Sequence, residues 1–119
     1  MRMKHSRTRA IDFRRKYVQR DNEGVPIITY GSPYTVIGEI WPASDALQAQ
    51  TYGDRINSIL NVRIKGEYDI SQDGNETVYT FDYFSIREGD GVCVYSNNAD
   101  YKVISIKPYK PIRMEIQKL

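Results

Sequence analysis

The sequence predicts an all-β fold: a small β-barrel or sandwich of about six to eight short antiparallel strands, with one long loop that carries a short helical turn. The 119 residues include ten tyrosines and many valines and isoleucines, which are frequent in strands. Gly, Asn, Asp and Pro separate these runs at short intervals, as turns do in small β proteins. A chain of this length has room for one core, so we expect one domain.

The first two strands are expected to form a hairpin. A strand from about Phe13 to Arg20 leads into residues 21–24, Asp-Asn-Glu-Gly, whose types favour a turn, and residues 25–30 return. Pro26 places this second strand at a sheet edge or delays its start, because proline has no amide hydrogen to donate.

The next two strands differ in how their apolar residues are arranged. Residues 35–41 are apolar on both faces, which predicts a strand that is buried on both sides and ends at Pro42. Residues 61–65 alternate instead, with Val62 and Ile64 expected inside and the intervening charged residues in solvent.

The remaining strands lie in the second half of the chain. Residues 66–77 are polar and are expected to form a loop or a long hairpin tip before an aromatic strand, Val78 to Phe84. A second hairpin pairs residues 92–95 with 101–106, and alternation over 112–117 predicts a final strand.

Two residue types limit the chemistry that this chain can perform. Cys93 is the only cysteine and lies in an apolar run, so we expect it to be a packing residue. His5 is the only histidine, which leaves a histidine metal site, a Ser-His-Asp triad or a Cys-His pair without a second group. We therefore expect no enzyme activity, no metal and no cofactor. No apolar run suits a membrane span or a secretory signal, so synthesis in the cytoplasm is expected.

Charge is unevenly distributed along the chain. Residues 1–20 contain eight Lys or Arg and one Asp, whereas the remaining residues contain nine Lys or Arg and fourteen Asp or Glu. We expect a flexible basic arm over residues 1–12, followed by one barrel domain over 13–119. Such an arm can bind nucleic acid, bind the acidic face of a neighbouring subunit, or only aid solubility. Its basic residues are Arg2, Lys4, Arg7 and Arg9.

The segment from Trp41 to Gly53 interrupts the predicted strands. It is rich in Ala and Gln, with Ser44 or Asp45 as a possible N-cap and Gly53 as a C-terminal stop. A helix this short is marginal alone, so it is expected either to contact a partner or to cap an open end of the barrel, with Leu47 and Tyr52 in the core. The candidate contact residues are Ser44, Asp45, Leu47, Gln48, Gln50, Tyr52 and Arg55. A second candidate loop contains Glu67, Asp69, Gln72, Asp73 and Asn75.

The same segment carries a family resemblance. A strand ending in Ile-Trp-Pro-Ala-Ser is followed by Gln-x-x-x-Tyr-Gly-x-Arg over residues 48–55, and later by Ile-x-x-Gly-Asp over 86–90 and Tyr-x-Val-x-Ser-Ile over 101–106. This order resembles the head-tail joining, or head-completion, family of tailed bacteriophages, and the likeness covers roughly residues 12–119.

The resemblance implies a small β-barrel that forms a ring, often twelvefold, in the virion neck. The portal adaptor would lie above it and a tail protein below, and packaged double-stranded DNA would pass through or contact the lumen. In such rings a long loop projects into the channel and helps to retain DNA; residues 42–55 and 66–77 are the two candidates for it.

The main alternative is a nucleic-acid-binding barrel of the OB or SH3 type. Tyr79, Phe81 and Tyr83 share one face of a predicted strand, where aromatic side chains can stack on bases. Glu76 and Asp82 on the other face, and the acidic body, oppose binding to phosphates.

Overall fold

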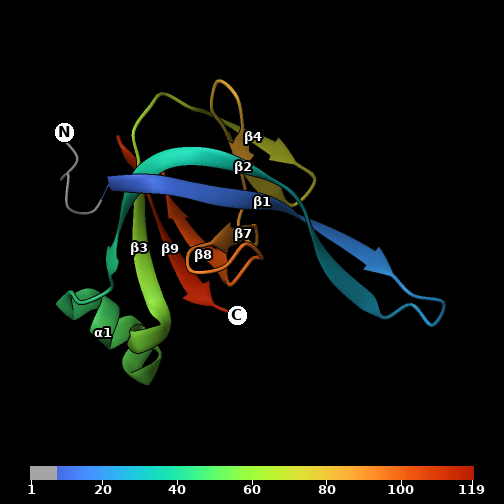
Figure 1. Ribbon diagram of the computed structural model, residues 1–119, viewed down its shortest axis with the longest axis horizontal. Helices are drawn as coiled ribbons and strands as arrows, with labels where there is room; N and C mark the ends of the chain where they lie inside the picture. The colour runs from blue at the N-terminus through green and yellow to red at the C-terminus, as the bar shows by residue number, and fades with distance from the viewer. Residues whose placement is uncertain (1–7) are drawn as a thin grey trace.

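The computed structural model describes residues 8–119, which form a closed six-stranded antiparallel barrel with a three-stranded sheet beside it (Figure 1). The predicted all-β barrel is therefore confirmed. The barrel consists of β1 (Thr8–Arg20), β2 (Pro26–Pro42), β3 (Ile59–Ile64), β9 (Ile112–Lys118), β8 (Tyr101–Lys107) and β7 (Gly91–Cys93), in that order around the wall. The small sheet contains β4 (Asp69–Asp73), β5 (Glu76–Thr80) and β6 (Ser85–Ile86). Between β2 and β3 lie the helix α1 (Ala46–Tyr52) and the 3-10 helix η1 (Gly53–Ser58).

The barrel interior is filled by side chains that alternate along each strand. Phe13 on β1, Val62 on β3 and Met114 on β9 are completely buried, and Ile64 is nearly so. The expected inward direction of Val62 and Ile64 is confirmed. Each such side chain contributes about 1.5–3 kcal/mol through burial alone, so the closed wall is the main source of stability.

An aromatic cluster joins the small sheet to the barrel. Phe13 stacks on Tyr34, Tyr34 on Phe84, and Phe84 on Phe81, with ring centroids 5.9, 5.5 and 4.7 Å apart. Tyr68 also packs against Phe81, with ring centroids 5.4 Å apart. The two sheets thus share one hydrophobic core.

Several strand predictions are confirmed and others need correction. The hairpin β7–β8 and the final strand β9 lie where expected. Residues 66–77 contain the tip of the β4–β5 hairpin, the second of the two forms expected there, whereas the expected aromatic strand is broken, because β5 ends at Thr80 and β6 begins at Ser85. Cys93 is buried in the wall, as predicted.

Strand β2 is not buried on both faces, as its apolar run suggested. Val36 points into the barrel, but Ile37 is exposed, because no second layer covers the outer face at this point. The two strands expected over residues 25–30 and 35–41 are one continuous strand, but its pairing with β1 is irregular between them: Arg14 pairs with Pro33 and Lys16 with Tyr30, so that one residue of β1 lies opposite two residues of β2.

The predicted boundary of the basic arm at residue 12 is also too late. Residues 8–12 pair with residues 35–39 of β2 and are part of the barrel wall. Arg9 is therefore a strand residue, and its guanidinium donates to the carbonyl oxygen of Val94 at 2.7 Å. Arg2, Lys4 and Arg7 lie outside the described residues.

The broken aromatic run provides a test of the core. Replacing Phe81 with Ala should lower the free energy of unfolding by about 3–5 kcal/mol, because it removes a buried ring between the two sheets. Tyr83→Ala is the matched control, since Tyr83 is 96% exposed and its loss should change stability by less than about 0.5 kcal/mol. Urea unfolding measures the free energy of unfolding of both variants. Equal decreases for Phe81→Ala and Tyr83→Ala would contradict a core shared by the two sheets.

Candidate functional site

The segment between β2 and β3 folds into a short capped helix. The Asp45 side chain accepts a hydrogen bond from the Gln48 amide at 2.8 Å, and Gly53 ends α1 with a positive φ of 55°. Both predicted caps are thus present. The structure also shows why so short a helix persists, since its inner face is bonded to the barrel.

A buried polar network makes this connection. Gln48 donates through its side-chain amide to Asn61 on β3 and to Glu115 on β9, the second at 2.8 Å. Tyr52 and Lys107 donate to the other Glu115 oxygen at 2.9 and 2.8 Å. Gln48, Asn61 and Glu115 are all buried, so each depends on the others for its hydrogen bonds.

The network changes the acidity of its members. Burial by itself raises the pKa of Glu115, but the hydrogen bonds from Lys107, Gln48 and Tyr52 outweigh it, and the pKa lies below its usual range. Burial and the bond to Glu115 raise the pKa of Tyr52 to about 12. The carboxylate is therefore ionised and the phenol protonated at neutral pH.

The contact residues predicted in this segment consequently divide into two groups. Gln48 and Tyr52 face the barrel and anchor the helix. Leu47, expected as a possible core plug, is instead 70% exposed. Ser44, Asp45, Gln50 and Arg55 are exposed as well.

Trp41 strengthens the same anchor from the end of β2. The guanidinium groups of Arg63 and Arg113 lie 5.3 and 5.4 Å from its ring centre, within cation–π range. Arg113 also approaches Asp45, the N-cap residue, at 3.5 Å. Trp41 is thus a structural residue, as expected of the end of a strand.

The second candidate loop is the hairpin formed by β4 and β5. Residues 66–90 contain seven Asp or Glu and one basic residue, Arg87. Arg87 forms ion pairs with Asp73 and Glu76, each at 3.0 Å. Within the described part of the chain, four exposed acids of this segment form no ion pair: Glu67, Asp69, Asp82 and Glu88. We call residues 66–90 the acidic segment.

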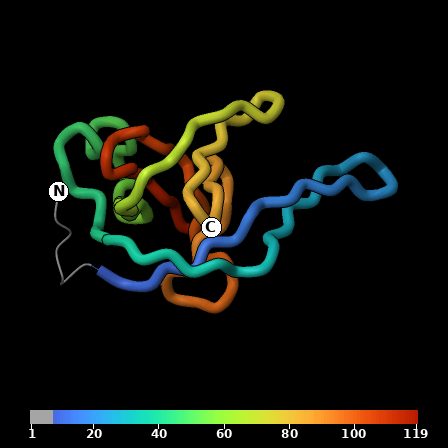
Figure 2. Tube along the Cα trace, turned by 90° about the horizontal axis from the view of Figure 1, so that it is seen from above, coloured from blue at the N-terminus to red at the C-terminus, as the bar shows by residue number. Residues whose placement is uncertain are grey.

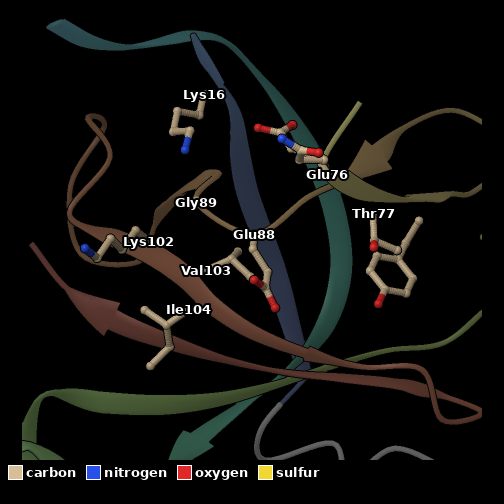
Figure 3. A pocket seen from close by; sticks show the side chains of 10 residues that line it. Lys16, Glu76, Thr77, Glu88, Gly89, Lys102, Val103 and Ile104 are labelled. Atoms are coloured by element: carbon tan, nitrogen blue, oxygen red, sulfur yellow. The ribbon is translucent and has the colours of Figure 1, made fainter. Parts of the chain in front are cut away.

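A groove of about 490 Å³ separates this small sheet from β8. Figure 3 shows Lys102 on one side of it and Thr77 on the other, with Glu88 between them. Lys16 and Glu76 also line the groove. Its charges are mixed, and among residues 8–119 no three His, Cys, Asp or Glu side chains are grouped so that they could hold a metal ion.

The feature that the sequence did not reveal is a hairpin that extends beyond the barrel. Residues 15–30 of β1 and β2 continue past the last barrel contact and project into solvent at the opposite end of the molecule from α1 (Figures 1 and 2). We call these residues the projecting hairpin. Both strands were predicted, but the point where they leave the barrel depends on where β7 ends.

A buried carboxylate holds the base of this hairpin. At the irregularity in β1, the Lys16 amide donates to Asp90 Oδ1 at 3.0 Å, and the Arg87 amide donates to Oδ2 at 3.1 Å. Burial raises the pKa of Asp90, although these two hydrogen bonds and nearby arginines oppose the effect. Asp90 thus bonds Lys16 on the side where β7 no longer pairs with β1.

The far end of the hairpin is also well defined. Asp21 accepts from the amides of Glu23 and Val25, both at 2.9 Å, and Gly24 adopts a φ of 81° that other residues rarely reach. The turn predicted at residues 21–24 is confirmed.

The projecting hairpin exposes apolar side chains on both of its faces. Val18 and Ile28 are cross-strand partners on one face, and Tyr17 and Ile27 lie on the other. These four side chains and Val25 are each 45–55% exposed. An isolated two-stranded hairpin is at best marginally stable in water, so this surface suits a protein partner that covers it.

The aromatic residues that favoured nucleic-acid binding are not available for stacking as a set. Tyr79 and Phe81 are buried in the shared core, and only Tyr83 is exposed. Residues 8–119 carry fourteen Lys or Arg and fifteen Asp or Glu, which leaves little net attraction to phosphates.

No helix within residues 8–119 has the length and apolar character needed to cross a membrane. Comparison of the chain with known protein families, curated proteins and solved structures found no match.

The anchoring network predicts a pH dependence. Since the pKa of Glu115 is lower in the folded state, its contribution is complete above the unfolded value of about 4.3 and is lost as the pH falls through the folded value. Glu115→Gln should lower the free energy of unfolding by about 1.5–3 kcal/mol at pH 7. It should also reduce the further decrease in this free energy as the pH falls. Urea unfolding at several pH values measures both effects. Glu67→Gln, at an exposed acid without an ion pair, is the control; equal behaviour of the two variants would contradict the network's role.

A second prediction addresses DNA. Any binding of single- or double-stranded DNA by the full chain should be lost when residues 1–7 are deleted. The reason is that residues 8–119 contain fourteen basic and fifteen acidic side chains, so their charges nearly cancel. A titration at two salt concentrations measures this. Salt-sensitive micromolar binding by residues 8–119 would favour the OB- or SH3-like interpretation instead.

Proposed function

We propose that this chain is a structural subunit of the neck of a tailed bacteriophage, where copies form a ring below the portal and its adaptor. The ring would complete the head, help to retain packaged DNA and provide the surface to which the tail attaches. The proposal draws on the motif order of residues 12–119 and on the barrel architecture that such a subunit requires.

The observation that carries the proposal is the projecting hairpin. The barrel is closed without these residues, so they are not needed to complete the fold. Their apolar side chains would lower the free energy only if another protein surface covered them. A subunit whose exposed apolar side chains are covered by neighbours in an assembly has this property.

The opposite end of the molecule provides a separate contact surface. There α1 is fixed to the barrel through Gln48 and Tyr52, while Leu47 points outward. A ring subunit needs at least two different surfaces, one for each neighbour, and more for the adaptor and the tail. We assign the exposed side of α1 to the adaptor or the tail, and the turn of the β4–β5 hairpin to the channel, which leaves the edge of β4 for a neighbouring subunit.

The acidic segment suits a channel that passes DNA. Its exposed carboxylates would repel phosphates, so that DNA slides through the lumen without adhering. The protein would accordingly be made in the bacterial cytoplasm and reside at the head-tail junction of the virion.

Deletion of the gene from its phage genome tests the function. Filled heads and free tails should accumulate without joining, and the heads should lose DNA. Adding the purified protein should restore joined, infectious particles, which electron microscopy and infectious titre measure. Normal joining without the gene would overturn the proposal.

Two variants on the same strand refine this test. Ile28→Asp places a charge on the projecting hairpin and should reduce add-back activity at least tenfold, the equivalent of about 1.4 kcal/mol of binding. Ile37→Asp places the same charge on the outer barrel wall, where Ile37 is similarly exposed, and should retain activity. Full activity of Ile28→Asp would show that the hairpin does not carry the assembly contact.

A further inference from the structure

The projecting hairpin and the acidic segment have complementary properties within one chain. The two hairpin strands carry only positive charges, on Arg15, Lys16 and Arg20, while both acids lie at the turn. None of these three cations forms an ion pair with the described residues. The acidic segment likewise has four exposed acids without ion pairs.

The acidic segment also offers an open strand edge. Strand β4 pairs with β5 on one side only, so its other edge presents unpaired backbone groups. All five of its residues are exposed, and the second one, Ile70, exposes 54% of its surface. Asp69 directly precedes Ile70 in sequence, and Glu67 lies three positions before it. The start of this edge thus combines one exposed apolar side chain with two unpaired acids.

The hairpin does not occupy this edge within its own chain. The tip of the hairpin and the β4–β5 turn extend toward the same side of the molecule but lie apart in Figure 2, and no pairing joins β4 to β1 or β2. The two surfaces are therefore both free in the single subunit.

We propose that the projecting hairpin of one copy docks on the β4 edge of a second copy, with Ile28 and Val18 near Ile70 and with Arg20, on the same face of the hairpin as Val18, near Glu67 and Asp69. This inference rests on the proposed function, to which it adds the surfaces that join neighbouring subunits. Apolar contact supplies affinity, backbone groups at the open edge can pair, and opposite charges select the partner and its orientation.

The contact joins two different surfaces, so its repetition generates a ring when the rotation between copies closes. Each copy then gives one hairpin and receives one.

Cross-linking between two single-cysteine proteins tests the contact. In a Cys93→Ala background, Ile28→Cys protein is mixed with Ile70→Cys protein, assembled on heads that lack the native protein, and treated with a short bismaleimide. Cross-linked dimers should form from this pair at least tenfold more than from Ile28→Cys with Leu47→Cys. Leu47 is the control because it is exposed at the opposite end of the subunit.

Charge reversal supplies a second measurement. Arg20→Glu should suppress the 28–70 cross-link, and Glu67→Lys with Asp69→Lys in the receiving copy should restore it, whereas Arg15→Glu, on the opposite face beside Tyr17, is the matched control and should leave it unchanged. Failure of restoration, or equal cross-linking to position 47, would overturn the inference.

The outcomes also separate the inference from the proposed function. If the protein restores head-tail joining but forms no 28–70 cross-link, the proposed function stands and the proposed contact is refuted. If concentrated free protein forms a strong 28–70 cross-link but never restores joining, the proposed contact stands and the proposed function is refuted.

Discussion

The rest of the structure depends on the pairing between β1 and β2. Over residues 8–14 and 33–39 the two strands are neighbours in the barrel wall. Over residues 16–20 and 26–30 the same two strands pair only with each other and project into solvent. The change occurs where β7 ends and Asp90 accepts the Lys16 amide. One continuous ribbon therefore supplies both the core and the surface that we assign to assembly.

The opposite end of the molecule is stabilised in a different way. There the helix is held by hydrogen bonds to a buried carboxylate rather than by apolar packing. Glu115 accepts from three side chains on two elements, and removing Gln48 would take the side-chain donor from one of its buried oxygens and the partner from Asn61. Such a network tolerates few alternatives, so it fixes α1 in one position on the barrel. A rigid α1 presents its exposed side to a partner with little loss of conformational entropy.

These two ends give the subunit a direction. The projecting hairpin extends from one end, α1 covers the other, and the acidic segment lies on the side of the barrel (Figure 1). A molecule with different surfaces at each end is suited to head-to-tail packing, whereas a symmetric dimer would reuse one surface. This directionality is the physical link between the fold and the proposed ring.

The sequence by itself determined the all-β class, the turn at residues 21–24, the β7–β8 hairpin and the caps of α1, because these depend on local residue types and alternation. It also placed Val62 and Ile64 inside. It did not show that Gln48, Asn61 and Glu115 meet, since residues far apart in the chain converge only when the barrel closes. Nor did it show that four apolar residues of the projecting hairpin are exposed: Tyr17, Val18, Ile27 and Ile28. Apolar residues on a strand are predicted to be buried until the neighbouring strands are known. Tertiary structure decided which apolar strand residues were left for a partner, and it did so through the early end of β7.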